Sequence, residues 1–420
     1  MVLSRKIFVG VAAALAAVVS VSACSSSGTS SSGTSSSSTS ASAAAAATGG
    51  AQSSATGSPV KIGVLCSCSG PFGMTIASAW NVVQAWQKSV DASGGLNGHP
   101  VDLTEMDNGS NPGTAATNAQ KMISANVAAI IDLDILDAVW QKPVSAAKIP
   151  VIGGNFSSPP FYTDTNWYPS GQTNDSITYA VVATAKQAGA KNLAQLYCAE
   201  SVQCQESVPL IKADGQSLGV PDVYNASIAA TAPNYTAQCV AAKQAGVTAI
   251  FIGDSTSVIA RVAEDCNAQG YNPIYITEGT GFTNQALTTP GLKDHLWSPY
   301  PILPYFSTDA AVTAMNTVLD KYYPGITQNS NTWSEFAVQA WTAGLLVAQA
   351  VKNAGVTAGD TVSSADITKG LDMVSNQTLG GFSPSLTFTA GQAHPVDCWY
   401  TGRVQGGTAS QVGGLTCEKG

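Results

Sequence analysis

Polar residues follow several short apolar segments of this sequence, where a strand would end. Ser69, Thr256 and Glu278 each come just after such a segment, and Glu278 stands before Gly279-Thr280-Gly281, a turn sequence. A carboxylate that projects past the end of a strand can pair with an ammonium group, and the two hydroxyls can donate or accept hydrogen bonds. The simpler alternatives are a solvated loop carboxylate at Glu278 and a helix cap at Asp254 or Ser255, next to Thr256.

Patterns that indicate catalysis or a cofactor are not found in the sequence. There is no G-x-S-x-G, H-E-x-x-H or G-x-x-x-x-G-K-[ST] motif, and Gly279-Thr280-Gly281 lacks the third glycine of a nucleotide-binding loop. The three histidines, His99, His295 and His394, have no neighbouring nucleophile, and none accompanies a cysteine pair as a zinc site would require. The sequence therefore predicts a binding protein without a cofactor or metal, and not an enzyme.

The elements that position these residues start with a strand, a helix and a second strand. Lys61–Leu65 is a short β-branched run, and from Met74 apolar residues recur every three to four positions, as on one face of a helix. The glycines of Gly94–Gly98 end that helix, and Val101–Leu103 is again extended. Such a unit forms a parallel crossover, and ligands collect at the carboxyl ends of its strands.

Strand–helix alternation continues along the chain and is interrupted twice, near Gln172 and near Tyr300. This predicts an α/β fold with two lobes. The family resemblance described below implies that the lobes are doubly wound, joined by a hinge and separated by a cleft. We expect residues 59–173 and 300–380 to form lobe 1, and residues 174–299 and 381–420 to form lobe 2.

The first 58 residues are typical of an export signal and a tether. Arg5 and Lys6 precede an uncharged apolar run, so residues 1–23 are predicted to be a signal peptide. Val21-Ser22-Ala23-Cys24 resembles a lipoprotein cleavage box, in which Cys24 carries the lipid; the alternative is an ordinary secreted protein. Residues 24–58 are rich in Ser, Thr, Ala and Gly and form a flexible linker. We therefore expect an extracytoplasmic protein, lipid-anchored to the cell membrane.

Charge and cysteine content agree with export. The net charge is −8 at pH 7 with 10% charged residues, and no basic cluster is present, so nucleic acid is not an expected partner. Without Cys24 eight cysteines remain, an even number that favours disulfides in an oxidising compartment. Local spacing favours three pairs and leaves Cys66 and Cys68 open: Cys198 with Cys204, Cys239 with Cys266, and Cys398 with Cys417.

An ordered set of short motifs resembles the type I periplasmic binding protein fold, and in particular the branched-chain amino acid receptors of ABC transporters. The motifs are Lys61-Ile62-Gly63-Val64 with Ser69-Gly70-Pro71, Gly94-Gly95-Leu96-Asn97-Gly98, Asp107 with Pro112, Ala116 and Lys121, Ile149-Pro150-Val151-Ile152, and Tyr275–Gly279 with Glu278. They extend over most of residues 60–400.

The resemblance implies a clamp that closes on a small molecule and delivers it to membrane permease subunits. It implies that Ser69 and Phe72 lie at the cleft edge, that Phe156 and Ser157 belong to a loop with donors for a carboxylate, and that Glu278 faces a ligand amine. It also places the loop between Cys198 and Cys204 near the ligand, so that Glu200 or Gln203 are further candidates.

One segment departs from the amino acid receptors. After the third strand these receptors have a serine-rich turn that holds the ligand carboxylate, whereas this chain has Asp132-Leu133-Asp134-Ile135-Leu136-Asp137. Either these aspartates cap helices and point elsewhere, or the ligand lacks the usual α-carboxylate. An amine, an amide, a peptide-like compound and an apolar small molecule remain open as ligands.

The predicted function is that of a substrate-binding lipoprotein of an ABC importer, which captures a small polar or amine-bearing solute such as an amino acid or amide. The alternative is an extracellular clamp that senses a ligand and signals to a membrane partner.

Overall fold

The structure is a computed structural model that describes residues 55–70, 73–154, 158–200, 202–329 and 333–418. The predicted signal peptide, Cys24 and most of the predicted linker lie outside these residues. Within the described part, no helix combines the length and the apolar character that crossing a bilayer requires.

The first sheet contains five parallel strands, in the spatial order β2-β1-β3-β4-β5. Its central strands are covered on both faces and therefore consist of continuous apolar runs, which is the pattern read in the sequence from Lys61 onward. The strands are β1 (Val60–Cys66), β2 (Val101–Asp107), β3 (Ala129–Leu133), β4 (Val151–Gly153) and β5 (Trp167–Tyr168).

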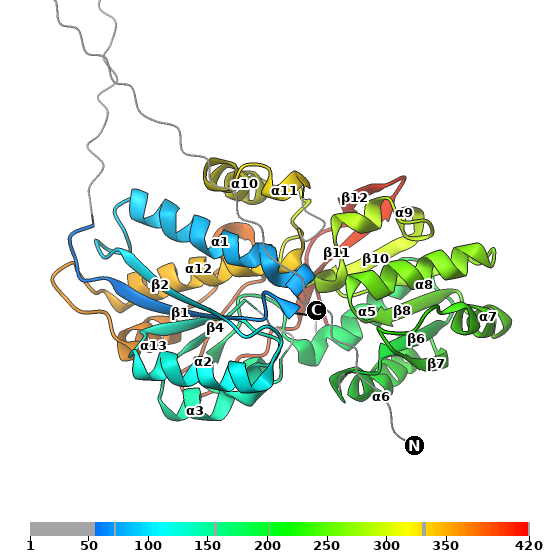
Figure 1. Ribbon diagram of the computed structural model, residues 1–420, viewed down its shortest axis with the longest axis horizontal. Coiled ribbons are helices and arrows are strands. Elements are labelled where there is room, and N and C mark those ends of the chain that lie inside the picture. The colour runs from blue at the N-terminus through cyan, green and yellow to red at the C-terminus, as the bar shows by residue number, and fades with distance from the viewer. Residues whose placement is uncertain (1–54, 71–72, 155–157, 201, 330–332, 419–420) are drawn as a thin grey trace, which may run out of the picture. The chain divides into compact units, whose positions relative to one another are not determined.

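Helices cover both faces of this sheet (Figure 1). One face carries α1 (Gly73–Ala92) and α12 (Glu335–Ala354), and the other carries α2 (Pro112–Ser124) and α3 (Gln141–Ala146). Asn111 caps α2 by accepting the Thr114 amide hydrogen over 3.0 Å. The remaining elements around it are α4 (Pro160–Thr163), α10 (Ala310–Tyr322), α11 (Ile326–Asn329), α13 (Ser364–Asp372), and the 3₁₀ turns η2 (Asp137–Val139) and η6 (Leu379–Gly381).

The second sheet has the spatial order β12-β11-β10-β9-β8-β6-β7, and β13 pairs with β11. Its strands from β6 to β10 run parallel, and the C-terminal strand β11 is added antiparallel to β10. The strands are β6 (Leu193–Cys198), β7 (Asp222–Ile228), β8 (Ala249–Gly253), β9 (Ile274–Ile276), β10 (Leu296–Tyr300), β11 (Cys398–Gln405), β12 (Thr408–Gln411) and β13 (Thr416–Cys417).

Two helix pairs sandwich the second sheet (Figure 1). They are α5 (Ile177–Gln187) with α6 (Val202–Leu218), and α7 (Thr236–Gln244) with α8 (Thr256–Ala268). The short elements are α9 (Leu292–His295), η3 (Asn174–Ser176), η4 (Gly279–Gly281) and η5 (Asn284–Leu287). The expected α/β fold with two lobes, each built on its own sheet, is therefore confirmed.

The chain passes between the two lobes three times, and hydrogen bonds join these passages. The Gln172 amide donates to the Pro301 carbonyl over 2.9 Å, and the Thr173 amide donates to the Val396 carbonyl over 2.9 Å. The Val396 amide donates in turn to the Thr173 hydroxyl over 2.7 Å. Three adjacent passages of this kind form a hinge.

The sequence predicted that the chain returns from lobe 1 to lobe 2 at residue 381. In the structure this third passage comes later in the chain. Phe388 and His394 still pack on Tyr168 of lobe 1, with ring centroids 5.3 and 4.8 Å away. The chain joins the second sheet only with β11.

Aromatic residues fill the region where lobe 2 contacts α12. Phe282, Tyr300, Tyr305 and Phe306 pack against one another edge-on or tilted, with centroid distances of 5.2–6.1 Å, and Trp333 adds an edge contact to Tyr305 at 6.1 Å. The main hydrophobic cluster therefore continues from one lobe into the other beside the hinge.

All eight cysteines of the described residues form disulfides. The three pairs favoured by spacing are present, and the pair that the sequence left open is bridged as well: Cys66–Cys68, Cys198–Cys204, Cys239–Cys266 and Cys398–Cys417. Two of them, Cys66–Cys68 and Cys198–Cys204, lie at the carboxyl ends of β1 and β6, where they fix the turns that follow these strands.

Candidate functional site

Glu278 stands two residues beyond the end of β9, where the chain turns into η4. The Gly281 amide donates to the Glu278 carbonyl over 2.8 Å and closes this turn. Gly279 lies so close to Tyr300 that an added Cβ would come within 2.5 Å of the tyrosine ring. A residue with a side chain does not fit there, so the turn holds the Glu278 side chain in a defined direction.

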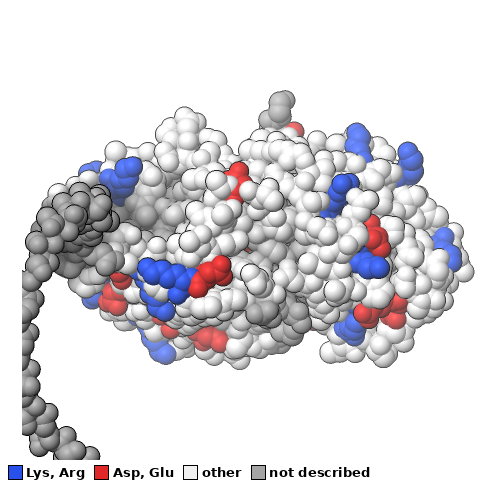
Figure 2. Space-filling view, turned by 90° about the horizontal axis from the view of Figure 1, so that it is seen from above, with Lys and Arg blue, Asp and Glu red and all other residues white. Residues whose placement is uncertain are grey.

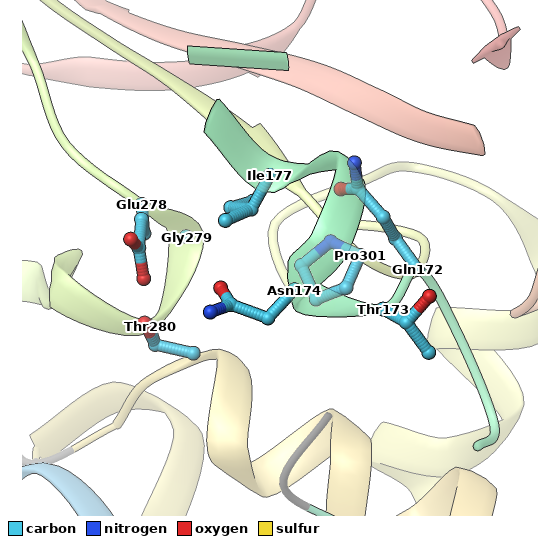
Figure 3. A pocket seen from close by; sticks show the side chains of 8 residues that line it. All are labelled: Gln172, Thr173, Asn174, Ile177, Glu278, Gly279, Thr280 and Pro301. Carbon is cyan, nitrogen blue, oxygen red and sulfur yellow. The ribbon is translucent and has the colours of Figure 1, made fainter. Parts of the chain in front are cut away.

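The Glu278 carboxylate faces a small pocket at the hinge (Figure 3). The pocket is partly open to solvent, and its inner space of about 20 Å³ has room for about one water molecule. Its lining comes from the first passage and the start of α5, from the η4 turn, and from the second passage: Gln172, Thr173, Asn174, Ile177, Glu278, Gly279, Thr280 and Pro301.

No hydrogen-bond or ion-pair partner satisfies the Glu278 carboxylate among the described residues. Burial raises the pKa of this carboxyl to about 7, and no opposite charge counteracts the effect. In Figure 3 the Asn174 amide and the Thr280 side chain lie on the same side of the pocket as the carboxylate. The Gln172 Oε1 atom, at the pocket wall, is also buried without a donor. The Glu278 carboxylate and the Gln172 Oε1 atom are thus acceptors without a donor among the described residues.

Thr256 does not line this pocket, although it supports it. Its hydroxyl donates to the Gly281 carbonyl over 3.3 Å, which ties the start of α8 to the Glu278 turn. Asp254, just before, accepts the Ser255 amide hydrogen at Oδ1 over 2.6 Å, while its Oδ2 is buried without a partner. Glu200, a weaker candidate, accepts the Ala230 amide hydrogen over 2.7 Å.

The predicted residues of lobe 1 do not gather at this pocket. Ser69 is exposed, and both its amide and its hydroxyl donate to the Asp107 carboxylate. Phe72, Phe156 and Ser157 lie outside the described residues. Of the predicted ligand-binding residues, the structure therefore places Glu278 in the pocket and Thr256 behind it.

Sequence reasoning missed the contribution of the hinge to the pocket. Gln172, Asn174 and Pro301 belong to irregular passages that have no periodic pattern. The only signal in the sequence was the double interruption of the strand–helix alternation near Gln172 and Tyr300. Because two passages must lie together between the lobes, their residues were candidates for one site.

Asp132 in β3 and Asp134 and Asp137 just after this strand are all fully buried. Asp134 accepts hydrogen bonds from the Ser67 hydroxyl (2.7 Å), the Leu136 amide (2.8 Å) and the Trp140 indole (2.8 Å). Asp134 is thus a structural acceptor that holds the turn, although neither it nor its neighbours caps η2 or α3 with a side chain.

Asp132 and Asp137 form an acidic pair without a cation. Burial raises the pKa of both carboxyls, that of Asp137 to about 7, and the mutual repulsion of the aspartates raises that of Asp132 further. At neutral pH the pair therefore holds at least one proton.

We expect Asp132→Asn to stabilise the protein at pH 8 by about 1–3 kcal/mol, because an amide removes the repulsion and still accepts the Asp134 amide hydrogen that Asp132 binds over 2.8 Å. Raised carboxyl pKa values mean that the folded state binds more protons, so the wild type gains stability as the pH falls from about 7 towards 4. The stabilisation that Asp132→Asn gives relative to the wild type should therefore be smaller at pH 5 than at pH 8.

Urea unfolding of both proteins at pH 8 and pH 5 checks this prediction. Asp102→Asn, which removes an exposed carboxylate of the same sheet, is the matched control. Equal effects of Asp132→Asn at the two pH values would contradict the proposed pair.

The surface of the described residues carries few charges. In the view of Figure 2, Lys and Arg side chains lie singly or beside acidic ones, without a continuous basic area. The one ion pair within 4.0 Å among the described residues is Lys293–Asp294, an exposed pair. The carboxylates of the cleft edge thus remain uncompensated.

Comparisons with known proteins agree with this architecture. The model of the family described as periplasmic binding protein matches residues 59–409. A search of curated proteins finds no match. Among solved structures, the fatty acid ABC transporter substrate-binding protein from Thermomonospora curvata is similar with a TM-score of 0.73 at 17% identity, over 88% of this chain and 95% of that chain.

Two further structures have different ligands in their descriptions. A solute-binding protein of an ABC transporter from R. palustris, in complex with benzoate, has a TM-score of 0.70 at 18% identity, over 86% of this chain and 96% of that chain. The branched-chain amino acid transporter substrate-binding protein LivJ from Streptococcus pneumoniae, in complex with isoleucine, has a TM-score of 0.69 at 15% identity, over 84% of this chain and 99% of that chain. At these identities the likeness shows the fold.

Proposed function

Since the chain belongs to the periplasmic binding protein family, we propose that it is the substrate-binding component of an ABC importer and captures a small, polar, amine-bearing solute between its lobes. Members of this family bind solutes and do not catalyse reactions. In this proposal Cys24 carries the lipid that holds the protein at the outer side of the cell membrane, and the linker up to residue 58 gives it reach towards the permease.

The observation that carries the proposal is the unpaired carboxylate of Glu278 in the hinge pocket. A buried carboxylate without a partner is unfavourable, and an ammonium group relieves that cost by pairing with it. The Asn174 side chain supplies a further acceptor on the same side, and Ile177 and Pro301 supply apolar contacts for a short carbon chain. An amine-bearing solute matches this combination.

In this proposal the lobes move when the solute binds. The pocket as it stands has room for about one water molecule, and the lobes open about the passages near Gln172, Pro301 and Val396 and close over the ligand. A ligand favours the closed form only by binding it more tightly than the open form. Glu278 and Asn174 belong to different segments, the η4 turn and the first passage, and their side chains lie on the same side of the pocket, so both can engage one ligand.

A thermal-shift screen of the chain without its signal peptide tests the proposed function. The screen contains primary amines, amides, amino acids and carboxylic acids of matched carbon skeleton. We expect the amine-bearing compounds to raise the melting temperature, since a ligand at 100 times its Kd stabilises the folded state by about 2.7 kcal/mol. Stabilisation by carboxylic acids alone would contradict the proposal.

A further inference from the structure

We propose that Gln172 determines the specificity of the hinge pocket by accepting a second hydrogen bond from the ammonium group that Glu278 holds, so that the preferred solute is a primary amine rather than an N-methylated one. The inference rests on the proposed function, because it takes Glu278 as the partner of the ammonium charge. It adds a residue of the first passage to the site and narrows the substrate class.

Gln172 and Glu278 reach the same pocket from two segments of the chain. Gln172 lies in the first passage, before α5, whereas Glu278 lies in the turn after β9, and both line the pocket. In Figure 3 the two side chains lie on opposite sides of the pocket, and the Gln172 amide oxygen is on the side of Ile177. The backbone of Gln172 is fixed, since its amide donates to the Pro301 carbonyl over 2.9 Å.

A chain of hydrogen bonds fixes the orientation of the Gln172 amide group. The Ser176 hydroxyl donates its hydrogen to the carbonyl oxygens of Thr173 (3.2 Å) and Val396 (3.3 Å), so towards Gln172 it acts as an acceptor. The Gln172 Nε2 atom donates to this hydroxyl over 2.9 Å. Because the nitrogen is bound to Ser176, Oε1 is the end of the amide that remains for a ligand.

The Gln172 Oε1 atom is an acceptor without a donor. Gln172 is only 2% exposed, and its Oε1 atom is buried with no hydrogen-bond partner among the described residues. A buried carbonyl oxygen in this condition is unfavourable, and so is the buried carboxylate of Glu278, whose pKa no partner lowers. A solute that brings two donors into the pocket relieves both.

An ammonium head matches two acceptors around so small a space. The inner space of about 20 Å³ has room for about one water molecule, and an ammonium nitrogen is of similar size. A primary ammonium group has three N–H donors, so one can go to Glu278 and another to Gln172 while the carbon chain leaves on the open side. A dimethylated amine has one N–H donor in its cationic form, and its methyl groups need space that the inner pocket lacks.

Isothermal titration calorimetry of the wild type with butylamine and N,N-dimethylbutylamine tests the proposal. Both amines are monocations at pH 8 and have the same carbon chain, but the first has three N–H donors and the second has one. We expect butylamine to bind at least about tenfold more tightly, as one charge-assisted hydrogen bond requires. Equal affinities would overturn the role of Gln172, and this comparison needs no variant.

Gln172→Met isolates the amide oxygen. Methionine has nearly the shape of glutamine and lacks a strong acceptor. The substitution should lower the affinity for butylamine by about tenfold and that for N,N-dimethylbutylamine by less than about threefold, because the single N–H of the second amine goes to Glu278. The preference for butylamine should therefore become much smaller than in the wild type.

Ser176→Ala is the matched control. It removes the hydroxyl that binds the Gln172 nitrogen and leaves the amide oxygen in the chain. We expect this variant to retain the preference for butylamine. If Ser176→Ala reduces the preference as much as Gln172→Met does, Gln172 acts only through the packing of the hinge, and the proposal is overturned.

The outcomes separate this proposal from the proposed function. An equal loss of both amines in Gln172→Met would overturn the specificity role of Gln172, while amine capture at Glu278 stands. If neither probe binds the wild type, the specificity proposal fails. If no amine of the thermal-shift screen binds either, the proposed function fails with it.

Discussion

Glu278→Gln is expected to weaken the binding of an amine-bearing solute by about 100-fold or more. The substitution keeps the shape of the side chain and removes the charge that pairs with the ammonium group inside the pocket. Loss of a charge-assisted interaction at an enclosed site costs about 2–5 kcal/mol, which corresponds to this range of affinities. Titration calorimetry of wild type and variant with the best amine of the screen measures the effect.

The pH dependence of binding provides a second readout of the same residue. With a pKa of about 7, Glu278 is largely protonated at pH 6 and largely ionised at pH 8. Affinity for an amine should therefore rise by up to about tenfold over this interval, because only the ionised carboxylate pairs with the ammonium group. In Glu278→Gln this rise should disappear. A variant that keeps wild-type affinity and pH dependence would refute the assignment of Glu278.

The stability of the ligand-free protein should change with pH in the opposite direction to its affinity for an amine. A carboxyl whose pKa is raised from 4.5 to about 7 on folding binds more protons in the folded state, so it favours folding as the pH falls through this interval. Solute and protons therefore compete for Glu278, and the stabilisation by an amine should be larger at pH 8 than at pH 6.

The second large effect is expected from Gly370→Ala, which should destabilise the protein by about 3 kcal/mol or more. Gly370 lies in α13 against α12, and a Cβ atom there would stand 1.9 Å from the Ala350 carbonyl oxygen. The Ala350 oxygen belongs to the backbone of α12 and the Cβ is fixed to the backbone of α13, so the helices themselves would have to separate and lose buried contacts. The Asn353 side chain, which donates to the Gly370 carbonyl over 2.9 Å, would be displaced as well.

Urea unfolding of Gly370→Ala and of a matched control measures this effect. Gly359→Ala is the control, because Gly359 is exposed, its backbone does not require glycine, and the nearest atom to an added Cβ is the Thr357 hydroxyl at 4.0 Å. We expect the control to change the free energy of unfolding by less than about 0.5 kcal/mol. Similar values for both variants would show that α12 and α13 tolerate separation.

Much of the fold was predictable because its strands and helices differ in the spacing of apolar residues. The run Lys61–Leu65, the helical repeat after Met74 and the glycines of Gly94–Gly98 correspond to β1, α1 and the turn before β2. The two interruptions of the pattern marked the passages near Gln172 and Tyr300. The third passage was placed too early because the segment up to His394 is irregular, and its packing on Tyr168 leaves no periodic signal.

Residues of the candidate site could be predicted only where they are part of a local sequence pattern. Glu278 was a candidate because it follows a strand and precedes a glycine turn, and because its segment resembles the one that faces the ligand amine in the family; the structure places it at the pocket, and its role as a ligand contact stays a prediction. Asn174 and Pro301 were not candidates, since they meet only in the folded chain. The burial of Asp132 and Asp137 also escaped prediction, because alternating carboxylates ordinarily indicate exposure, and the indole and hydroxyl donors to Asp134 come from Trp140 and Ser67.

The threefold passage of the chain between the lobes also affects how the molecule withstands proteolysis. A nick at any one of the bonds near Gln172, Pro301 or Val396 leaves two intact covalent connections, and the hydrogen bonds among these segments hold the cut ends in place. A protein of this kind can be cleaved once by an extracellular protease and still keep both lobes together. For the same reason neither lobe is a contiguous stretch of sequence that a gene truncation could remove cleanly.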